Sequence, residues 1–184
     1  MTGYILLGVV VVLLVGAVTI YNRLVTNKNM VAEGWSGIDV QLKRRNDLIP
    51  NLIETVKGYM GHERGVLDQV TELRTKSQAA QGVADKARVE GAMGAALANL
   101  FAVAENYPDL KASQNFMELQ KSLADIEDQV QLARRYYNGA ARNFNILIQS
   151  FPSNLMASAF HFTTVEYFEI EDAAERAVPK VAFP

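Results

Sequence analysis

The sequence contains no cysteine and only two histidines among its 184 residues. The lack of cysteine excludes disulfides, thiolate chemistry, cysteine-liganded metal sites and a lipid-modified N-terminal cysteine. His62 and His161 stand alone in the sequence, without the His-Glu-x-x-His or paired Glu-x-x-His spacing that builds a metal site in a helical bundle. We therefore expect no metal site in this protein.

Catalytic motifs are also missing. The sequence has no glycine-rich phosphate loop, no nucleophile elbow and no Ser/His/Asp grouping. Glu127 and Asp128 are adjacent carboxylates, but neighbouring residues on a helix point apart and do not act together. The net charge of −2 argues against general nucleic-acid binding, which usually requires a basic face. We expect no enzymatic activity, no catalytic or cofactor-binding residues, no cofactor and no nucleic-acid partner.

Charge is absent from the side chains of the first 22 residues. Within them, residues 3–21 are almost wholly apolar and would span about 28 Å as a helix, close to the roughly 30 Å hydrocarbon core of a bilayer. Tyr4 and Tyr21 lie at its two ends, where aromatic side chains prefer the membrane–water interface. We predict a transmembrane anchor over residues 1–22 that contacts membrane lipid. Its representative residues are Tyr4, Leu6, Val10, Leu13, Val18 and Tyr21.

A cleavable signal peptide is the alternative to a retained anchor. Signal peptides begin with basic residues and have an apolar stretch of 7–15 residues before a cleavage site of small residues. This chain has no Lys or Arg before its longer apolar stretch, and Val15-Gly16-Ala17 only weakly imitates a cleavage site. We expect a retained, single-pass anchor in the cell membrane.

The basic residues are distributed unevenly around the apolar segment. None precedes it, whereas Arg23 and Lys28 follow it closely, and Lys43, Arg44 and Arg45 come later. Basic residues collect on the cytoplasmic side of a membrane span. The asymmetry therefore favours a short N-terminus outside the cell and a body in the cytoplasm.

Proline is scarce, with five residues in the chain, and helix-forming residues fill the stretches between prolines. The clearest helical pattern runs from Phe116 to Phe151, where apolar or small residues recur at alternating steps of three and four for five heptads. This helix would follow a cap at Ser113 and end at Phe151-Pro152. Because so long a helix is not stable alone, partner helices must cover its apolar stripe.

Three further helical stretches complete an all-α protein. Residues 21–46 continue from the anchor, with apolar residues at three- and four-residue steps. Residues 47–81 either begin a new helix at an Asp47 cap, with Pro50 in its first turn, or continue a helix from the membrane through residue 80 that is kinked at Pro50. Residues 83–105 are rich in small side chains, which predicts close packing against another helix.

The predicted domain boundaries follow from these patterns: an anchor at residues 1–22, a helical bundle at 23–162 and an acidic C-terminal tail at 163–184. Residues 163–170 mix β-branched and aromatic residues, which favours an extended conformation. The acidic residues of the tail include Glu169, Glu171 and Asp172.

Four separated motifs resemble those of a known family. They are IDVQLKRRNDLIPNLIETVKGY at residues 38–59, YPDLKA at 107–112, RRYYN at 134–138 and SFPSNL at 150–155. In this order the chain resembles the LemA family of bacterial membrane proteins. The resemblance implies an N-terminal anchor followed by an antiparallel bundle of long helices. It implies no established reaction, and one relative is associated with magnetosome membranes.

The densest cluster of charge is Lys43-Arg44-Arg45, with Asp47 and Glu54 nearby. This cluster would bind anionic lipid head groups or an acidic segment of a partner, or else it forms ion pairs on helix surfaces with Asp47 as a helix cap.

A second polar group surrounds Arg134 and Asn138. These residues either join Gln41, Arg45 or Asn51 of a neighbouring helix in a polar layer that fixes the register of the bundle, or form a binding pocket.

Two functions remain open from the sequence. The leading hypothesis is a non-catalytic, membrane-anchored helical scaffold that self-associates into a homo-oligomer. The alternative is an accessory or sensor subunit that docks another membrane protein through the acidic tail and the basic patch at residues 43–45.

Overall fold

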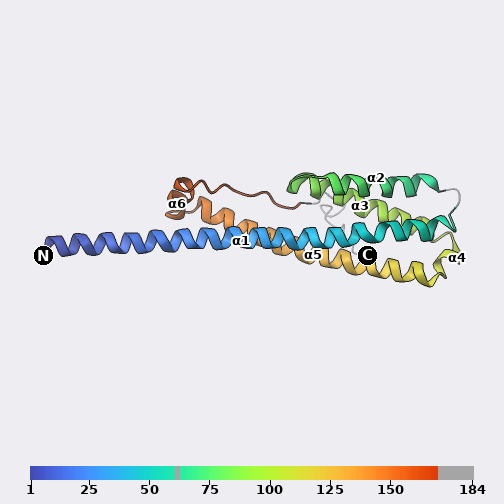
Figure 1. Cartoon of the computed structure of the whole chain (residues 1–184), viewed down its shortest axis with the longest axis horizontal. Coiled ribbons are helices and arrows are strands. Elements are labelled where there is room, and N and C mark those ends of the chain that lie inside the picture. The colour runs from blue at the N-terminus through green and yellow to red at the C-terminus, as the bar shows by residue number, and fades with distance from the viewer. Residues whose placement is uncertain (61–62, 170–184) are drawn as a thin grey trace, which may run out of the picture. The chain divides into compact units, whose positions relative to one another are not determined.

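A computed structural model describes residues 1–60 and 63–169 of the chain, and these residues form six helices and no strand (Figure 1). The helices are α1 (Thr2–Lys57), α2 (Arg64–Ala79), α3 (Val83–Ala104), α4 (Pro108–Lys111), α5 (Gln114–Gln149) and α6 (Ser153–Ala159). The all-α class predicted from the sequence is confirmed.

The chain divides into two compact units, and the two longest helices contribute to both. The first unit combines Met1–Gln41 with Gln129–Tyr167, so it contains the first part of α1, the second part of α5 and α6. The second unit contains Leu42–Asp128 and the described residues from Phe168 onward. The predicted boundaries, with an anchor at residues 1–22, a bundle at 23–162 and a tail at 163–184, stay a prediction.

Helix α1 is continuous through both Asp47 and Pro50 and ends at Lys57. Of the two alternatives left open by the sequence, the continuous helix is therefore the one that forms, and Asp47 is not a helix cap. The helix stops earlier than residue 80, because the chain turns at Gly58 and Tyr59 before α2 begins at Arg64. Glycine has a low helix propensity, which is consistent with an end at this point.

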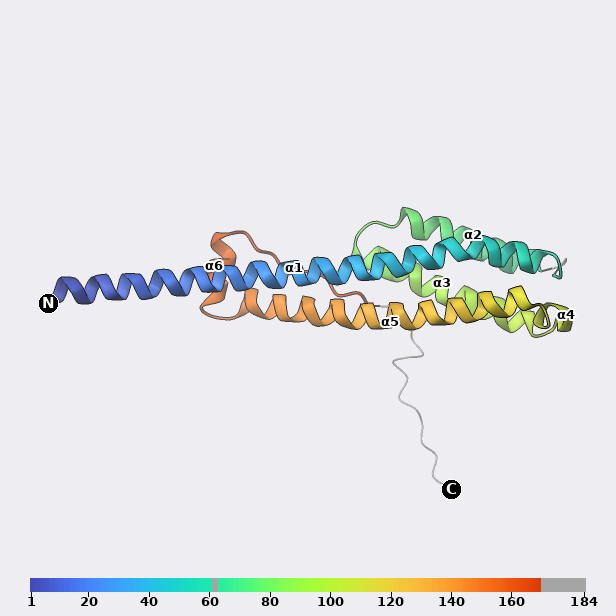
Figure 2. The same cartoon turned by 60° about the horizontal axis from the view of Figure 1, so that its bottom comes forward.

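In the first unit, α5 runs antiparallel to α1, and α6 lies beside α1 in both views (Figures 1 and 2).

The heptad pattern of α5 predicted its buried side well. Steps of three and four from Phe116 to Phe151 give eleven positions, and seven of them are buried, namely Phe116, Leu123, Ile126, Val130, Tyr137, Ala140 and Phe144. Leu119, Ala133 and Leu147 are half-buried, and Phe151, beyond the end of the helix, is exposed.

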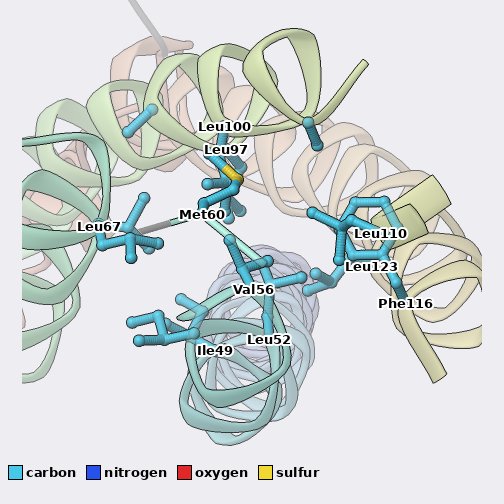
Figure 3. Close-up of a cluster of buried hydrophobic side chains, with 14 of the residues drawn as sticks. Ile49, Leu52, Val56, Met60, Leu67, Leu97, Leu100, Leu110, Phe116 and Leu123 are labelled. Carbon is cyan, nitrogen blue, oxygen red and sulfur yellow. The ribbon is translucent and has the colours of Figure 1, made fainter. Parts of the chain in front are cut away.

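The second unit has a hydrophobic core to which five helices contribute (Figure 3). The predicted third helix is confirmed as α3, which packs along α2. Met60, just after α1, lies buried among side chains from the surrounding helices. Those side chains include Ile49, Leu52, Val56, Leu67, Leu97, Leu100, Leu110, Phe116 and Leu123.

Candidate functional site

The apolar start of α1 is exposed on all sides. Five of the predicted anchor residues, Tyr4, Leu6, Val10, Leu13 and Val18, are exposed, whereas Tyr21 is half-buried. The first fully buried residue of the helix is Leu24, at 0% exposure. Among the described residues, α1 is the one helix that is long and apolar enough to cross a membrane, and none of its most apolar window is buried.

The end of this apolar segment meets the last part of the first unit through aromatic contacts. The ring of Tyr21 lies 4.7 Å from that of Phe160 and 6.1 Å from that of Phe162, measured between centroids. Phe162 also contacts Phe144 of α5 at 6.2 Å, and the Lys28 Nζ lies 5.7 Å from the Phe162 ring. Edge-to-face and tilted geometries such as these are the favoured arrangements of aromatic pairs.

Tyr137 is the centre of a second set of contacts within the first unit. Its ring lies 5.7 Å from that of Trp35, and its hydroxyl donates a 2.8 Å hydrogen bond to the backbone oxygen of Glu166. Burial raises the pKa of Tyr137, and the nearby charge of Glu166 raises it further. Asn145 binds the neighbouring residue Val165 through two hydrogen bonds of 2.9 Å. The side-chain NH2 of Asn145 donates to the backbone oxygen of Val165, and the side-chain oxygen of Asn145 accepts from the Val165 N–H.

Helices α1 and α5 approach closely at Gly34. A Cβ atom added to Gly34 would lie 2.9 Å from the Tyr137 Cα and 3.1 Å from the Tyr136 Cδ1. On the exposed side of this contact, the Tyr136 hydroxyl donates a 3.2 Å hydrogen bond to Glu33. Partial desolvation, followed by the Glu33 charge, raises the pKa of Tyr136. Glycine is required here because two helix backbones come together.

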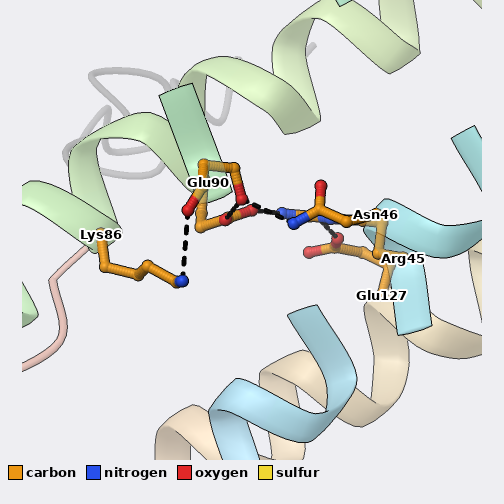
Figure 4. Close-up of polar contacts among 6 residues, drawn as sticks. Arg45, Asn46, Lys86, Glu90 and Glu127 are labelled. Atoms are coloured by element: carbon orange, nitrogen blue, oxygen red, sulfur yellow. Dashed lines mark hydrogen bonds and ion pairs between the residues drawn. The ribbon is translucent and has the colours of Figure 1, made fainter. Parts of the chain in front are cut away.

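The second unit contains a buried polar network around Arg45 (Figure 4). The Arg45 guanidinium forms an ion pair with Glu90 of α3, and its Nη1 donates a 2.8 Å hydrogen bond to Glu127 of α5. Their side chains are 3% exposed for Arg45, 1% for Glu90 and 42% for Glu127. Ser77 of α2 donates to Glu90 and accepts a 2.7 Å hydrogen bond from Asn46. The network therefore joins α1, α2, α3 and α5.

Pro50 is accommodated within α1 by the neighbouring helix α2. Proline has no backbone N–H, so the Asn46 carbonyl four residues earlier lacks its usual intrahelical donor. The Arg74 Nε donates a 2.9 Å hydrogen bond to this Asn46 oxygen. A side chain from α2 thus replaces the missing helical hydrogen bond, which allows α1 to continue past the proline.

The predicted contact residues separate into different environments. Lys43 and Arg44 are exposed, as expected for a contact surface. Arg45 is only 2% exposed, so its assignment to a surface patch is wrong: the carboxylates of Glu90 and Glu127 hold it inside the second unit. Glu169 is exposed, whereas Glu171 and Asp172 lie outside the described residues.

The polar layer proposed around Arg134 and Asn138 stays a prediction, but its proposed member Arg45 is held by Glu90 and Glu127. Sequence reasoning missed Glu90, although a carboxylate flanked by the small and apolar residues of α3 was a usable signal for a buried partner of Arg45. Within the described residues, no group of three or more His, Cys, Asp and Glu side chains is placed to hold a metal.

The apolar N-terminal segment and the two helical units define the class: an all-α protein with one candidate membrane helix. The chain belongs to the LemA family, whose sequence profile matches residues 34–183. Among its relatives, magnetosome protein MamQ 2 of Paramagnetospirillum magneticum is 26% identical, with 86% of this chain and 68% of the relative aligned. Protein LemA of Metamycoplasma hominis is 27% identical over 82% of this chain and 69% of the relative. Magnetosome protein MamQ of Magnetospirillum gryphiswaldense is 25% identical over the same shares as MamQ 2.

Proposed function

We propose that this protein is a non-catalytic, membrane-anchored scaffold that self-associates through the helices of its first unit. The apolar start of α1 supports the anchor, since residues 1–16 are all exposed. An apolar helix surface of this length has a favourable environment in a bilayer and an unfavourable one in water. Arg23 and Lys28, just after the segment, favour a cytoplasmic location for the rest of the chain.

The observation that carries self-association is a set of exposed apolar side chains on α1 and α5, the exposed stripe. Its members are Met30, Val40, Leu132 and Tyr136, each between 44% and 52% exposed. Leu132 and Tyr136 are four residues apart on α5, a spacing at which residues share one face of a helix, whereas Met30 and Val40 are ten residues apart on α1. The hydrogen bond from the Tyr136 hydroxyl to Glu33 connects α5 with α1 between Met30 and Val40 in the sequence.

Self-association would bury this stripe without altering the core. Residues that face inward on α5, such as Tyr137 and Phe144, are already buried, so the exposed stripe is a second, separate face of the same helices. Contiguous apolar patches on a surface mark contact sites, and we expect these four side chains to form one.

The test is the particle size of the gently solubilised full-length protein, measured by light scattering and negative-stain imaging. We expect particles that contain several copies of the chain. Leu132→Glu and Val40→Glu should dissociate them while leaving the helical circular dichroism unchanged. Ala32→Glu is the matched control, because it adds the same charge to an exposed α1 position outside the stripe.

Two results would contradict the proposal. A uniform monomer in the unmodified protein would remove self-association and favour docking to another membrane protein, for which Lys43, Arg44 and Glu169 are exposed. Oligomers that survive both stripe variants would show that other residues make the contact.

A further inference from the structure

Residues 151–160 comprise the turn after α5, helix α6 and the residue that follows it, and they expose large apolar side chains; we call this segment the turn between α5 and α6. Phe151 is 79% exposed, Leu155 is 62% exposed and Phe160 is 53% exposed. In α6, Ser153 and Ala157 face the rest of the first unit and are buried, which leaves Leu155 on the outer side of this short helix. The three exposed side chains therefore lie on an outer surface and not in the core.

This turn lies beside the end of the apolar segment of α1. Phe160 stacks against Tyr21 with 4.7 Å between ring centroids, and α6 lies beside α1 in both views (Figures 1 and 2). Tyr21 is the last residue of the apolar segment, and Leu24, one turn later, is fully buried. The exposed side chains of the turn are thus adjacent to the place where the proposed membrane span ends.

The sequence around the turn is also free of charge. No Asp, Glu, Lys or Arg occurs in residues 143–165, which include the end of α5, the turn and all of α6. The only comparable charge-free stretch is the proposed anchor itself, in residues 1–22. Charged groups are the side chains that a bilayer interior excludes most strongly, so both segments are suited to lipid contact.

We propose that the turn between α5 and α6 is a second membrane contact, in which Phe151, Leu155 and Phe160 insert into the boundary between head groups and acyl chains. This inference rests on the proposed anchoring by α1. Aromatic and leucine side chains on a surface element favour this boundary region. Arg23 and Lys28, on the α1 turns that follow Tyr21, would lie at the level of the lipid phosphates.

Lipid fits this surface better than a protein partner does, because the surface continues from the anchor. The contact between Tyr21 and Phe160 makes the apolar surface of α1 and that of the turn continuous. A membrane that surrounds α1 up to Tyr21 would reach Phe160 without any rearrangement of the first unit.

The test uses the full-length chain in lipid vesicles with an environment-sensitive fluorophore on a single cysteine. The natural sequence has no cysteine, so each probe site needs one substitution. Ser158→Cys places the probe on the exposed side of α6 and keeps Leu155 intact. Leu13→Cys probes the anchor, and Gln129→Cys probes an exposed position on α5, some 30 Å along the helix from the turn at 1.5 Å per residue.

Quenching is measured with lipids brominated at shallow or deep acyl positions and with aqueous iodide. We expect the Leu13→Cys probe to be quenched by deep bromines, the Ser158→Cys probe by shallow bromines, and the Gln129→Cys probe by iodide alone. Phe151→Ser combined with Leu155→Ser should remove the lipid quenching at Ser158→Cys and leave that at Leu13→Cys unchanged. Both replaced side chains are exposed, so this variant creates no core cavity.

The outcomes separate this inference from the proposed function. If the probe at residue 158 is quenched only by iodide while that at residue 13 is quenched by lipid, the turn lies in water and the inference is wrong, although the anchor stands. If neither is quenched by lipid, the anchor itself is absent. If the probe at residue 158 is shielded from both quenchers, protein covers the turn and the lipid contact is again refuted.

Discussion

Arg45 offers a sharp test of the buried network, because its charge is almost wholly removed from water. Its side chain is 3% exposed, and that of its partner Glu90 is 1% exposed. Arg45→Met keeps the length of the side chain but leaves the Glu90 carboxylate buried, with Ser77 as its remaining hydrogen-bond donor in the network. Removing one member of a buried ion pair costs about 3–5 kcal/mol, because the other charge stays uncompensated.

The reverse substitution should cost less. In Glu90→Met, Arg45 keeps its 2.8 Å hydrogen bond to Glu127, which is partly exposed and already solvated. The double variant Arg45→Met/Glu90→Met removes both buried charges; Glu127 loses its donor but is partly exposed, and the buried Ser77 hydroxyl loses its acceptor, a cost of about 1–3 kcal/mol. If the two sites were independent, the double variant would instead lose the sum of the two single effects, which is more than the roughly 3–5 kcal/mol of Arg45→Met alone.

Urea unfolding of the detergent-solubilised full chain measures these differences, with hydrogen exchange in α3 reporting on the second unit. The control is Lys76→Met, which breaks an ion pair with Glu72 on the surface of α2 and should leave unfolding unchanged. The reasoning is refuted if Arg45→Met unfolds like the Lys76→Met control. It is also refuted if the double variant loses as much stability as the two single variants added together.

Three other substitutions test the packing of the helices. Gly34→Ala should destabilise the first unit by roughly 1–3 kcal/mol in thermal unfolding, because the added Cβ overpacks against the Tyr137 backbone. Gly37→Ala, with nothing within 4 Å of an added Cβ, should be neutral or slightly stabilising. Equal effects of the two substitutions would disprove the close approach of α1 and α5 at Gly34. Folding raises the pKa of Tyr137 above 10.0, so the contribution of this residue to the free energy of unfolding is complete below pH 10 and is lost as the pH rises further. Tyr137→Phe should therefore flatten the alkaline decline of the unfolding midpoint. A decline parallel to that of the natural sequence would contradict this assignment. Arg74→Met should cost less stability in a Pro50→Ala background, where the helical hydrogen bond is restored, than in the natural sequence, and equal losses in a double-mutant cycle would show that Arg74 does not replace the missing donor.

Periodicity predicted the helices and their buried sides because both depend on local sequence. The alternation of three and four residues along α5 identified Tyr137 and Phe144 as core residues, and both are buried. Scarce proline and the small residues of α3 likewise indicated helices with close packing. These features are set by the 3.6-residue repeat of the helix and need no knowledge of the neighbours.

The buried network and the proline could not be assigned in this way, because both depend on residues distant in the sequence. Three consecutive basic residues at 43–45 look alike in the sequence, yet only Arg45 points inward, toward Glu90 and Glu127. Pro50 likewise predicted either a helix start or a kink. The helix continues past Pro50 because Arg74 donates to the Asn46 oxygen, and this contact joins residues that are 28 positions apart in the sequence.

One short stretch of α1 connects the exposed apolar start of this helix with the part that packs within the first unit. Up to Gly16 the helix is apolar and exposed on every side, and from Leu24 it buries one side within the first unit. The first charged side chain, Arg23, lies between these two residues. Because α1 is continuous here and Tyr21 contacts Phe160, the depth of the anchor in a membrane also fixes the depth of the turn between α5 and α6. Anchoring and surface contact would then be two consequences of one helix register, and a scaffold built from such chains would present its exposed stripe at a defined distance from the bilayer.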